Sequence, residues 1–323
     1  MNEACAKPHR PKAGWLGALI RVGLALVLIG VLIVRIDAPM SWQLIRSCRP
    51  WFVLLGFGFY LLLFFLCNLR WRVLLQSSGE RFSGWFLFRV YLASTALNAV
   101  LPTALGGDVL RVAWTAKGRD VTRMVSVVLV DRLLGLVGLL LLSSLASVSV
   151  FVTRGLGGFA LVSGAGLTMT FLLLLGIFWE PVYRPLAALV LRLRLFGVGA
   201  RIVNVTEEMR SLRKRPAVLI STFLLSLAVW VVHSLVWFVL GQAVGAGTGI
   251  TDYFVFVPLV ALATMMPVSV GGVGVRENSF VFLMTRVGMA QAQAGSIALL
   301  FLGTTYLYAL IGAAVLLGLR RSG

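Results

Sequence analysis

The segment Leu101-Pro-Thr-Ala-Leu-Gly-Gly-Asp-Val-Leu-Arg111 recurs later in the chain as Met266-Pro-Val-Ser-Val-Gly-Gly-Val-Gly-Val-Arg276. A proline, two adjacent glycines and an arginine match in both copies, at a constant offset of 165 residues. Proline removes a backbone donor and ends a helix, while paired glycines allow turns that other residues resist. Each copy follows a short apolar stretch, 86–101 or 253–266, and a second short stretch comes after it. The pattern therefore predicts two broken-helix hairpins.

The rest of the chain is apolar enough to place these hairpins in a membrane. Hydrophobic residues make up 59% of the sequence and charged residues only 12%, with a mean hydropathy of +0.97. Soluble domains carry roughly 25% charged residues and about 45–50% apolar ones. Six stretches approach or exceed the roughly 20 helical residues that cross the hydrocarbon core: 15–34, 51–69, 125–151, 159–178, 217–240 and 296–319. Because a broken helix survives at membrane depth only where protein or a watery cavity surrounds it, we expect both hairpins to be re-entrant.

The distribution of basic residues predicts the orientation in the membrane. With the N-terminus in the cytoplasm and each hairpin returning to its own side, cytoplasmic segments hold twenty Lys and Arg residues and the opposite side holds four. Such a bias is typical of cytoplasmic loops, so both termini are expected in the cytoplasm. The net charge of +18 is spread between apolar runs rather than gathered in one patch, and nucleic acid is not an expected partner. The basic segment 180–216 is either a helix on the membrane surface or an ordinary connector.

The orientation makes the two copies an inverted repeat. The offset that aligns the breaks also lays 51–69 onto the start of 217–240, and 125–151 onto the region containing 296–319. We therefore expect one all-α polytopic membrane domain, with about six transmembrane helices and two hairpins. Its parts would be an N-terminal tail and first helix (1–50), repeat 1 (51–151), a connecting helix with the basic segment (152–215) and repeat 2 (216–319). Inverted repeats with broken helices near the midplane are the architecture of many secondary transporters.

The hairpins also hold the residues most suited to binding an anion. A helix that starts near Gly106 or Gly271 would direct free N–H groups inward, and Arg111 and Arg276 could add bidentate donors for phosphate. An alternative is that these arginines only mark the hairpin ends at the interface. The predicted substrate-binding residues are Pro102, Gly106, Gly107, Asp108, Arg111, Asp131, Arg132, Pro267, Gly271, Gly272, Arg276 and Glu277.

Charges inside a membrane are costly and are usually paired. Asp131 and Arg132 are adjacent, so on a helix they point about 100° apart and need separate partners, for which Arg111 and Asp108 are candidates. Ser296 and Ile297 occupy the equivalent places in the second half. A structural role and a functional role for Asp131 and Arg132 both remain open. Thr95, Asn98 and Thr103 either line a cavity or only satisfy backbone groups left open by the break.

The sequence lacks the motifs of several enzyme classes. It contains no GxxxxGK[ST] loop, no HExxH and no nucleophile elbow. Cys5, Cys48 and Cys67 are widely spaced and form neither a CxxC pair nor a Cys/His cluster. We expect no catalytic residue, no metal and no cofactor.

Three motifs carry a resemblance to a known family. Asn98-Ala-Val-Leu-Pro-Thr-Ala-Leu-Gly-Gly-Asp-Val-Leu-Arg111, Asp131-Arg132-Leu-Leu-Gly135 and Pro267-Val-Ser-Val-Gly-Gly-Val-Gly-Val-Arg-Glu277 resemble the lysylphosphatidylglycerol synthase transmembrane family, also called flippase-like domain proteins. The resemblance implies a bacterial or archaeal cell-membrane protein that moves or handles lipids. The sequence ends at Gly323 without an aminoacyltransferase domain, so synthase activity is not expected. Phe301-Leu-Gly-Thr-Thr-Tyr306 lacks an arginine that many relatives carry there.

Three functions follow from these observations. The leading hypothesis is a flippase for a phosphate-bearing or aminoacylated lipid that works by alternating access of the two halves. The second is a membrane enzyme acting on a lipid-linked substrate, with Asp108 and Asp131 as its acids. The third is an accessory scaffold for a lipid-synthesis enzyme, in lipid-linked glycan, hopanoid or phospholipid synthesis. The expected partners are a membrane lipid and, as a candidate, such an enzyme, while the oligomeric state is left open.

Overall fold

The apolar stretches of the sequence form long helices in the computed structural model, which describes residues 14–321 except 101–105, 155–156, 193–198, 200–201, 204–205, 208–209, 211–213 and 266–268. The long helices match the six expected stretches: α1 (Gly14–Arg35), α3 (Pro50–Ser77), α6 (Val121–Arg154), α7 (Gly157–Phe178), α10 (Pro216–Ala243) and α13 (Gln291–Arg321). Between them lie the shorter α2 (Ala38–Arg46), α4 (Gly84–Val100), α5 (Gly106–Thr115), α8 (Glu180–Arg192), α11 (Ile250–Met265), η2 (Val270–Gly272) and α12 (Val275–Arg286). The described part contains no β-strand, so the protein is an all-α polytopic membrane protein.

Four of the long helices meet the length and apolarity of a membrane span on their own: α3, α6, α10 and α13. The other two, α1 and α7, meet it only together with the short helices α2 and α8, from which each is bent by 84°. Because α8 turns so sharply away from α7, it does not extend that helix along its axis. Of the two alternatives for the basic segment, this bend favours a helix on the membrane surface.

The helices follow the repeat that the sequence predicts. Shifted by 165 residues, α3, α4 and α6 fall on α10, α11 and α13, and the second hairpin helix α5 overlaps the start of α12. The contacts between the halves are also exchanged, since α6 packs on α11 as α13 packs on α4.

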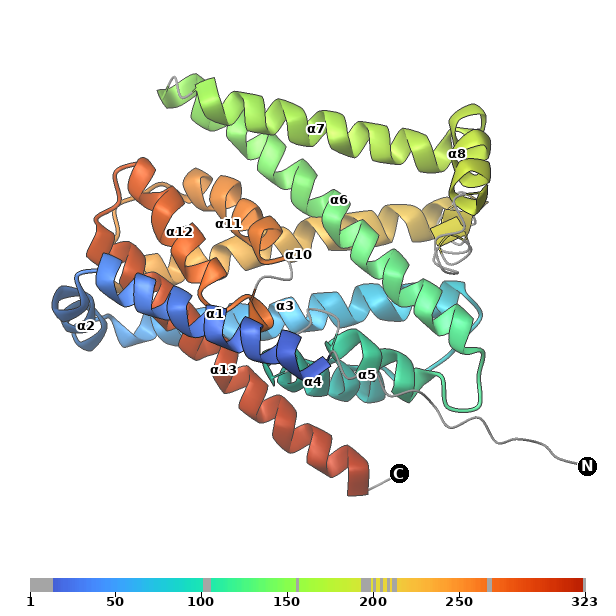
Figure 1. Ribbon diagram of the computed structural model, residues 1–323, viewed down its shortest axis with the longest axis horizontal. Coiled ribbons are helices and arrows are strands. Elements are labelled where there is room, and N and C mark those ends of the chain that lie inside the picture. Colours follow the sequence, from blue (N-terminus) through green and yellow to red (C-terminus); the bar gives the residue numbers. More distant parts are fainter. Residues whose placement is uncertain are drawn as a thin grey trace, which may run out of the picture.

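The central helices α3 and α10 lie side by side in opposite directions (Figure 1). At one end the Arg49 backbone N–H, just before α3, donates to the carbonyl of Ala243, the last residue of α10, at 3.0 Å. At the other end the Arg215 guanidinium, just before α10, donates to the carbonyl of Ser77, the last residue of α3. Equivalent helices of the two repeats therefore have opposite polarity.

Each hairpin enters and leaves at its own end of the molecule. Glu80, between α3 and α4, forms ion pairs with Arg119 at 2.7 Å and Arg123 at 3.7 Å, where α5 connects to α6. At the opposite end, Gln293 near the start of α13 donates to the Gly245 carbonyl after α10, at 3.2 Å. The hairpins are thus re-entrant from opposite ends, as expected.

The two hairpins meet in the interior. A Cβ built on Gly271 would lie 2.9 Å from the carbonyl oxygen of Asn98, near the end of α4. Gly271 also has a φ of 58°, a left-handed conformation that favours glycine. This position has two separate reasons to be glycine, and both belong to the junction between the repeats.

Two details differ from the expectations. The predicted start of the second short helix near Gly271 is wrong, because Gly271, Gly272 and Gly274 all have positive φ and unwind the chain until α12 begins at Val275. In addition, Arg70 and Arg111, counted in cytoplasmic segments, are buried within α3 and α5. The remaining basic residues still give a strong bias toward the predicted cytoplasmic side.

Candidate functional site

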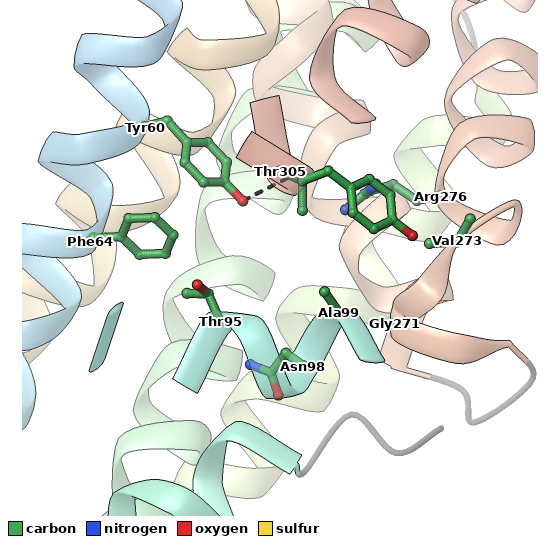
Figure 2. Close-up of a pocket in the computed structure, with 10 residues that line it drawn as sticks. Tyr60, Phe64, Thr95, Asn98, Ala99, Gly271, Val273, Arg276 and Thr305 are labelled. Atoms are coloured by element: carbon green, nitrogen blue, oxygen red, sulfur yellow. Dashed lines mark hydrogen bonds between the residues drawn. The ribbon is translucent and has the colours of Figure 1, made fainter. Parts of the chain in front are cut away.

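A cavity of about 210 Å³ lies where the hairpins meet (Figure 2). Both repeats contribute to it, with α3 and α4 from the first and η2, α12 and α13 from the second. An apolar cavity of about 150 Å³ can hold benzene, so this space is large enough for a headgroup fragment. Its lining residues are Tyr60, Phe64, Thr95, Asn98, Ala99, Gly271, Val273, Arg276, Thr305 and Tyr306.

Hydroxyl and amide groups line much of this cavity. The Tyr60 hydroxyl on α3 donates to the Thr305 hydroxyl on α13 at 3.5 Å, joining the two repeats across it (Figure 2). Thr95 and Asn98 project from α4, as expected for cavity-lining residues, whereas Thr103 lies outside the described residues. The cavity is therefore polar in part but carries little charge.

Arg276 is the one charged residue among those lining the cavity in the described part of the chain. It is the second residue of α12, and its side chain is 14% exposed. Its Nε donates to Oε1 of Glu277 at 2.9 Å, and its Nη2 lies 2.8 Å from the same oxygen without making a second hydrogen bond. The guanidinium also lies 4.9 Å from the ring centre of Phe301. It retains N–H donors beyond those that face Glu277.

Glu277 sits behind this arginine rather than in the cavity. Its side chain is 1% exposed, and its second oxygen accepts a hydrogen bond from the Gly274 backbone N–H at 2.7 Å. The carboxylate therefore caps the N-terminus of α12 and neutralises part of the Arg276 charge.

Arg111 occupies the equivalent sequence position but has a different environment. It is the sixth residue of α5, and its guanidinium donates to Asp131 at 3.0 Å and to Asp108 at 3.3 Å. Its side chain is 4% exposed and lies over the rings of Trp71, at 4.3 Å, and Tyr91, at 5.0 Å. This arginine is enclosed by carboxylates and aromatic rings.

Asp108 and Asp131 extend the contacts of Arg111 into a network across three helices. Arg70 on α3 donates to Asp131 at 2.7 Å, and Arg132 on α6 donates to Asp108 at 2.8 Å. Asp131 and Arg132 thus have separate partners, as their adjacent positions predict. We call Arg70, Asp108, Arg111, Asp131 and Arg132 the ion network.

The ion network also reaches the second repeat and the cavity wall. Arg70 donates to the Ser226 hydroxyl on α10 at 3.0 Å. Tyr91, which lies under Arg111, packs edge-on against Phe64 of the cavity, with ring centres 6.1 Å apart. The network is thus a neighbour of the cavity, separated from it by aromatic rings.

The predicted site residues therefore divide into two groups. Gly271 and Arg276 line the cavity, with Glu277 directly behind, whereas Asp108, Arg111, Asp131 and Arg132 form the ion network. Pro102 and Pro267 lie outside the described residues.

The other predicted glycines serve close packing at the breaks. Gly106 begins α5, and the Gly107 N–H donates to the Asn98 side-chain oxygen at 2.7 Å. A Cβ on Gly272 would lie 3.1 Å from Cβ of Thr264. Since Asn98 accepts from α5 and Glu277 accepts from the start of α12, each helix N-terminus already has an internal acceptor.

Sequence reasoning missed two kinds of residue. Tyr60, Phe64, Thr305 and Tyr306 line the cavity from apolar spans, where nothing in the pattern separates them from ordinary packing residues. Arg70 was placed in a loop because the apolar run ends at Leu69, although α3 continues to Ser77. The available signal was Asp131, because a carboxylate inside the membrane calls for cations on neighbouring helices, and Arg111 was the only cation considered for it.

A second, larger hollow of about 790 Å³ lies between α6, α7 and α10. Its lining is almost wholly apolar, as expected for a surface that contacts lipid chains. No group of three or more His, Cys, Asp or Glu side chains able to hold a metal occurs within the described ranges.

Comparison with protein families identifies one that covers most of the chain. The family model described as "Lysylphosphatidylglycerol synthase TM region" matches residues 18–312 of the 323-residue chain. No curated protein matches the chain. The matched range contains the cavity and the ion network.

Proposed function

The chain belongs to the lysylphosphatidylglycerol synthase TM region family, and from this premise we propose that it is a flippase for a phosphate-bearing or aminoacylated membrane lipid. The family indicates a membrane protein with a lipid-related function. The proposal adds translocation, without a catalytic step, across a cell membrane with both termini in the cytoplasm. A lipid-synthesis enzyme is a candidate partner that supplies the substrate.

The observation that carries this proposal is the placement of Arg276. Its guanidinium lines a cavity that two oppositely oriented repeats share. A phosphate is a good ligand for a guanidinium because paired N–H donors match two phosphate oxygens. In a site of low dielectric, one such contact is stronger than the same contact in water.

The repeat supports movement of the lipid as well as binding. Two hairpins enter from opposite ends and meet at Gly271 and Asn98, so in the proposed cycle each would provide a path to the cavity from one face of the membrane. Rocking of one repeat against the other would open these paths in turn, as in other transporters with inverted repeats. The lipid tails would remain in the bilayer while the headgroup passes the cavity.

The test is lipid movement in vesicles that contain the purified full-length protein. The vesicles contain phosphatidylglycerol with a fluorescent label on one acyl chain. Dithionite added outside destroys the fluorescence of lipid in the outer leaflet, so the further loss of fluorescence reports the rate of movement from the inner leaflet. We expect the wild-type protein to raise this rate and the double variant Arg276→Gln/Glu277→Gln to lower it at least tenfold. The double change removes both charges together, so it leaves no uncompensated buried carboxylate.

The matched control is Arg286→Gln, at the end of the same helix and outside the cavity lining. It should transport at the wild-type rate. If the double variant inserts, folds and moves the lipid as fast as the wild type, the proposed site is wrong. If the wild type moves no lipid at all, the proposed function is wrong.

A further inference from the structure

We propose that the cavity selects a lipid headgroup with a single phosphodiester charge and uncharged hydroxyl groups, such as phosphoglycerol, over its aminoacylated form. This inference rests on the proposed function and decides between the two lipid classes that it leaves open. The charges, the rings and the hydrogen-bonding groups at the cavity favour the uncharged hydroxyl groups.

The accessible charge of the cavity is positive. Arg276 is the charged residue of its described lining, and the carboxylate of Glu277 is turned away into contacts with Arg276 and the Gly274 N–H. The sequence of the two breaks, 101–105 and 266–268, contains no ionisable side chain that could add a negative charge. A cationic aminoacyl group would meet Arg276 with no carboxylate free to pair with it.

The aromatic residues of the lining offer little open ring surface to an ammonium group. A site for such a group needs an open ring face within about 6 Å of the cation. Tyr60 is packed against Phe64, Phe301 and Tyr308, with ring centres 5.0, 5.7 and 5.1 Å away, and it is 9% exposed.

Phe64 is enclosed in the same way, and it is 8% exposed. It has further ring contacts with Tyr91 and Tyr308. Tyr306 is the more open ring of the lining, at 42% exposed, so it offers one ring face, but the described lining places no carboxylate beside it to pair with an ammonium group. Tyr60 and Phe64 therefore close the cavity, and Tyr306 alone among the described lining rings presents an open face.

Uncharged polar groups complete the lining and suit hydroxyl partners. The Asn98 side-chain oxygen is used by the Gly107 N–H, which leaves its amide NH₂ as a donor. Thr95 donates to the Leu92 carbonyl, so its oxygen remains able to accept. Thr305 donates to the Phe301 carbonyl and accepts from Tyr60, which leaves its oxygen one further lone pair. A phosphoglycerol group can give its phosphate to Arg276 and exchange hydrogen bonds with these groups through its hydroxyls.

The experiment is a competition for the purified full-length protein. Phosphatidylglycerol, lysylphosphatidylglycerol and phosphatidylethanolamine with identical acyl chains are added in equal amounts, and native mass spectrometry measures which lipid stays bound. We expect phosphatidylglycerol to be retained at least tenfold over lysylphosphatidylglycerol. The double variant Arg276→Gln/Glu277→Gln should lose this preference, whereas Arg286→Gln should keep it.

The outcomes separate this inference from the function on which it rests. Equal or stronger retention of lysylphosphatidylglycerol or phosphatidylethanolamine overturns the selectivity, and the proposed function survives if that lipid is also moved in vesicles. Preference for phosphatidylglycerol that persists in the double variant shows that Arg276 is not its cause, which also overturns the inference. If none of the three lipids is retained or moved, both proposals fail.

Discussion

Two arginines at equivalent positions of the repeat, Arg111 and Arg276, have different environments. Arg111 donates to two carboxylates and lies over two rings, whereas Arg276 lies beside one carboxylate and lines the cavity. The difference follows from the start of each helix, because Arg111 is five residues into α5 while Arg276 is one residue into α12. The helix start thus decides whether the guanidinium lies in the ion network or at the cavity.

This contrast leads to a prediction for stability. Arg111→Gln leaves Asp131 and Asp108 with one guanidinium each in a buried setting. We expect the free energy of unfolding to fall by about 1–3 kcal/mol, because each buried carboxylate loses one hydrogen bond from Arg111 but keeps a second guanidinium. Thermal unfolding of the purified protein in detergent measures it.

The control for this prediction is an ion pair that faces solvent. Arg184 pairs with Glu180 at 2.9 Å, with side chains 78% and 44% exposed. Arg184→Gln should change the free energy of unfolding by less than about 1 kcal/mol. Equal effects of the two substitutions would show that the ion network is not a buried structural unit.

Elements are the scale at which the sequence was most informative. All six long helices were predicted from apolar length, and both breaks from proline and paired glycines. The constant offset then predicted which elements correspond. These features depend on the solvent that a segment meets and on local backbone freedom, both of which can be read from residue types.

The cavity could not be predicted in the same way. Whether Tyr60 or Thr305 packs in a core or lines a cavity depends on which helices face each other, and that is not encoded in the period of an apolar span. The conformation of the second break also escaped prediction. Gly274, which extends that break, has Val109 as its counterpart in the first copy.

The junction between the hairpins gives a prediction at the element scale. Gly271→Ala places a methyl group 2.9 Å from the Asn98 carbonyl and requires a left-handed conformation that alanine resists. We expect the hairpins to be pushed apart and the rate of lipid movement to fall at least fivefold, while helix content by circular dichroism is unchanged.

A glycine with space around it is the matched control. Gly303 on α13 has no atom within 4 Å of a Cβ built there. Gly303→Ala should therefore transport normally, because alanine also favours the helix more than glycine does. Loss of transport in both variants would show that glycine itself, and not the junction, is required.

The whole molecule presents opposite ends to opposite faces of the membrane. Cys48 precedes α3 at one end, and Ser78 follows the same helix at the other. With Cys5→Ala and Cys67→Ala in place, we expect Cys48 to react with a membrane-impermeant maleimide added outside intact cells. In the same background, Cys48→Ala with Ser78→Cys should react only after the cells are opened.

The labelling pattern checks orientation and inversion together. Gly245→Cys, just after α10, should behave like Cys48, because the Arg49–Ala243 hydrogen bond holds those ends together. Labelling of Gly245→Cys only from inside would contradict the antiparallel pairing of α3 and α10. If Cys48 and Gly245→Cys react only from inside and Ser78→Cys reacts from outside, the fold is supported but the predicted orientation in the membrane is wrong.

The unequal charge of the two repeats has a consequence for the energy profile along the bilayer normal. In the first repeat, Arg70 and Arg111 form ion pairs with Asp131. In the second repeat, the guanidinium of Arg276 lines the cavity, where a headgroup could contact it. In the proposed transport cycle, a headgroup that moves from one leaflet would therefore meet its strongest attraction at a different stage from a headgroup that moves the other way. In a passive cycle this asymmetry changes the rate at which lipid from each leaflet binds to the protein. It does not change the equilibrium distribution of lipid between the leaflets.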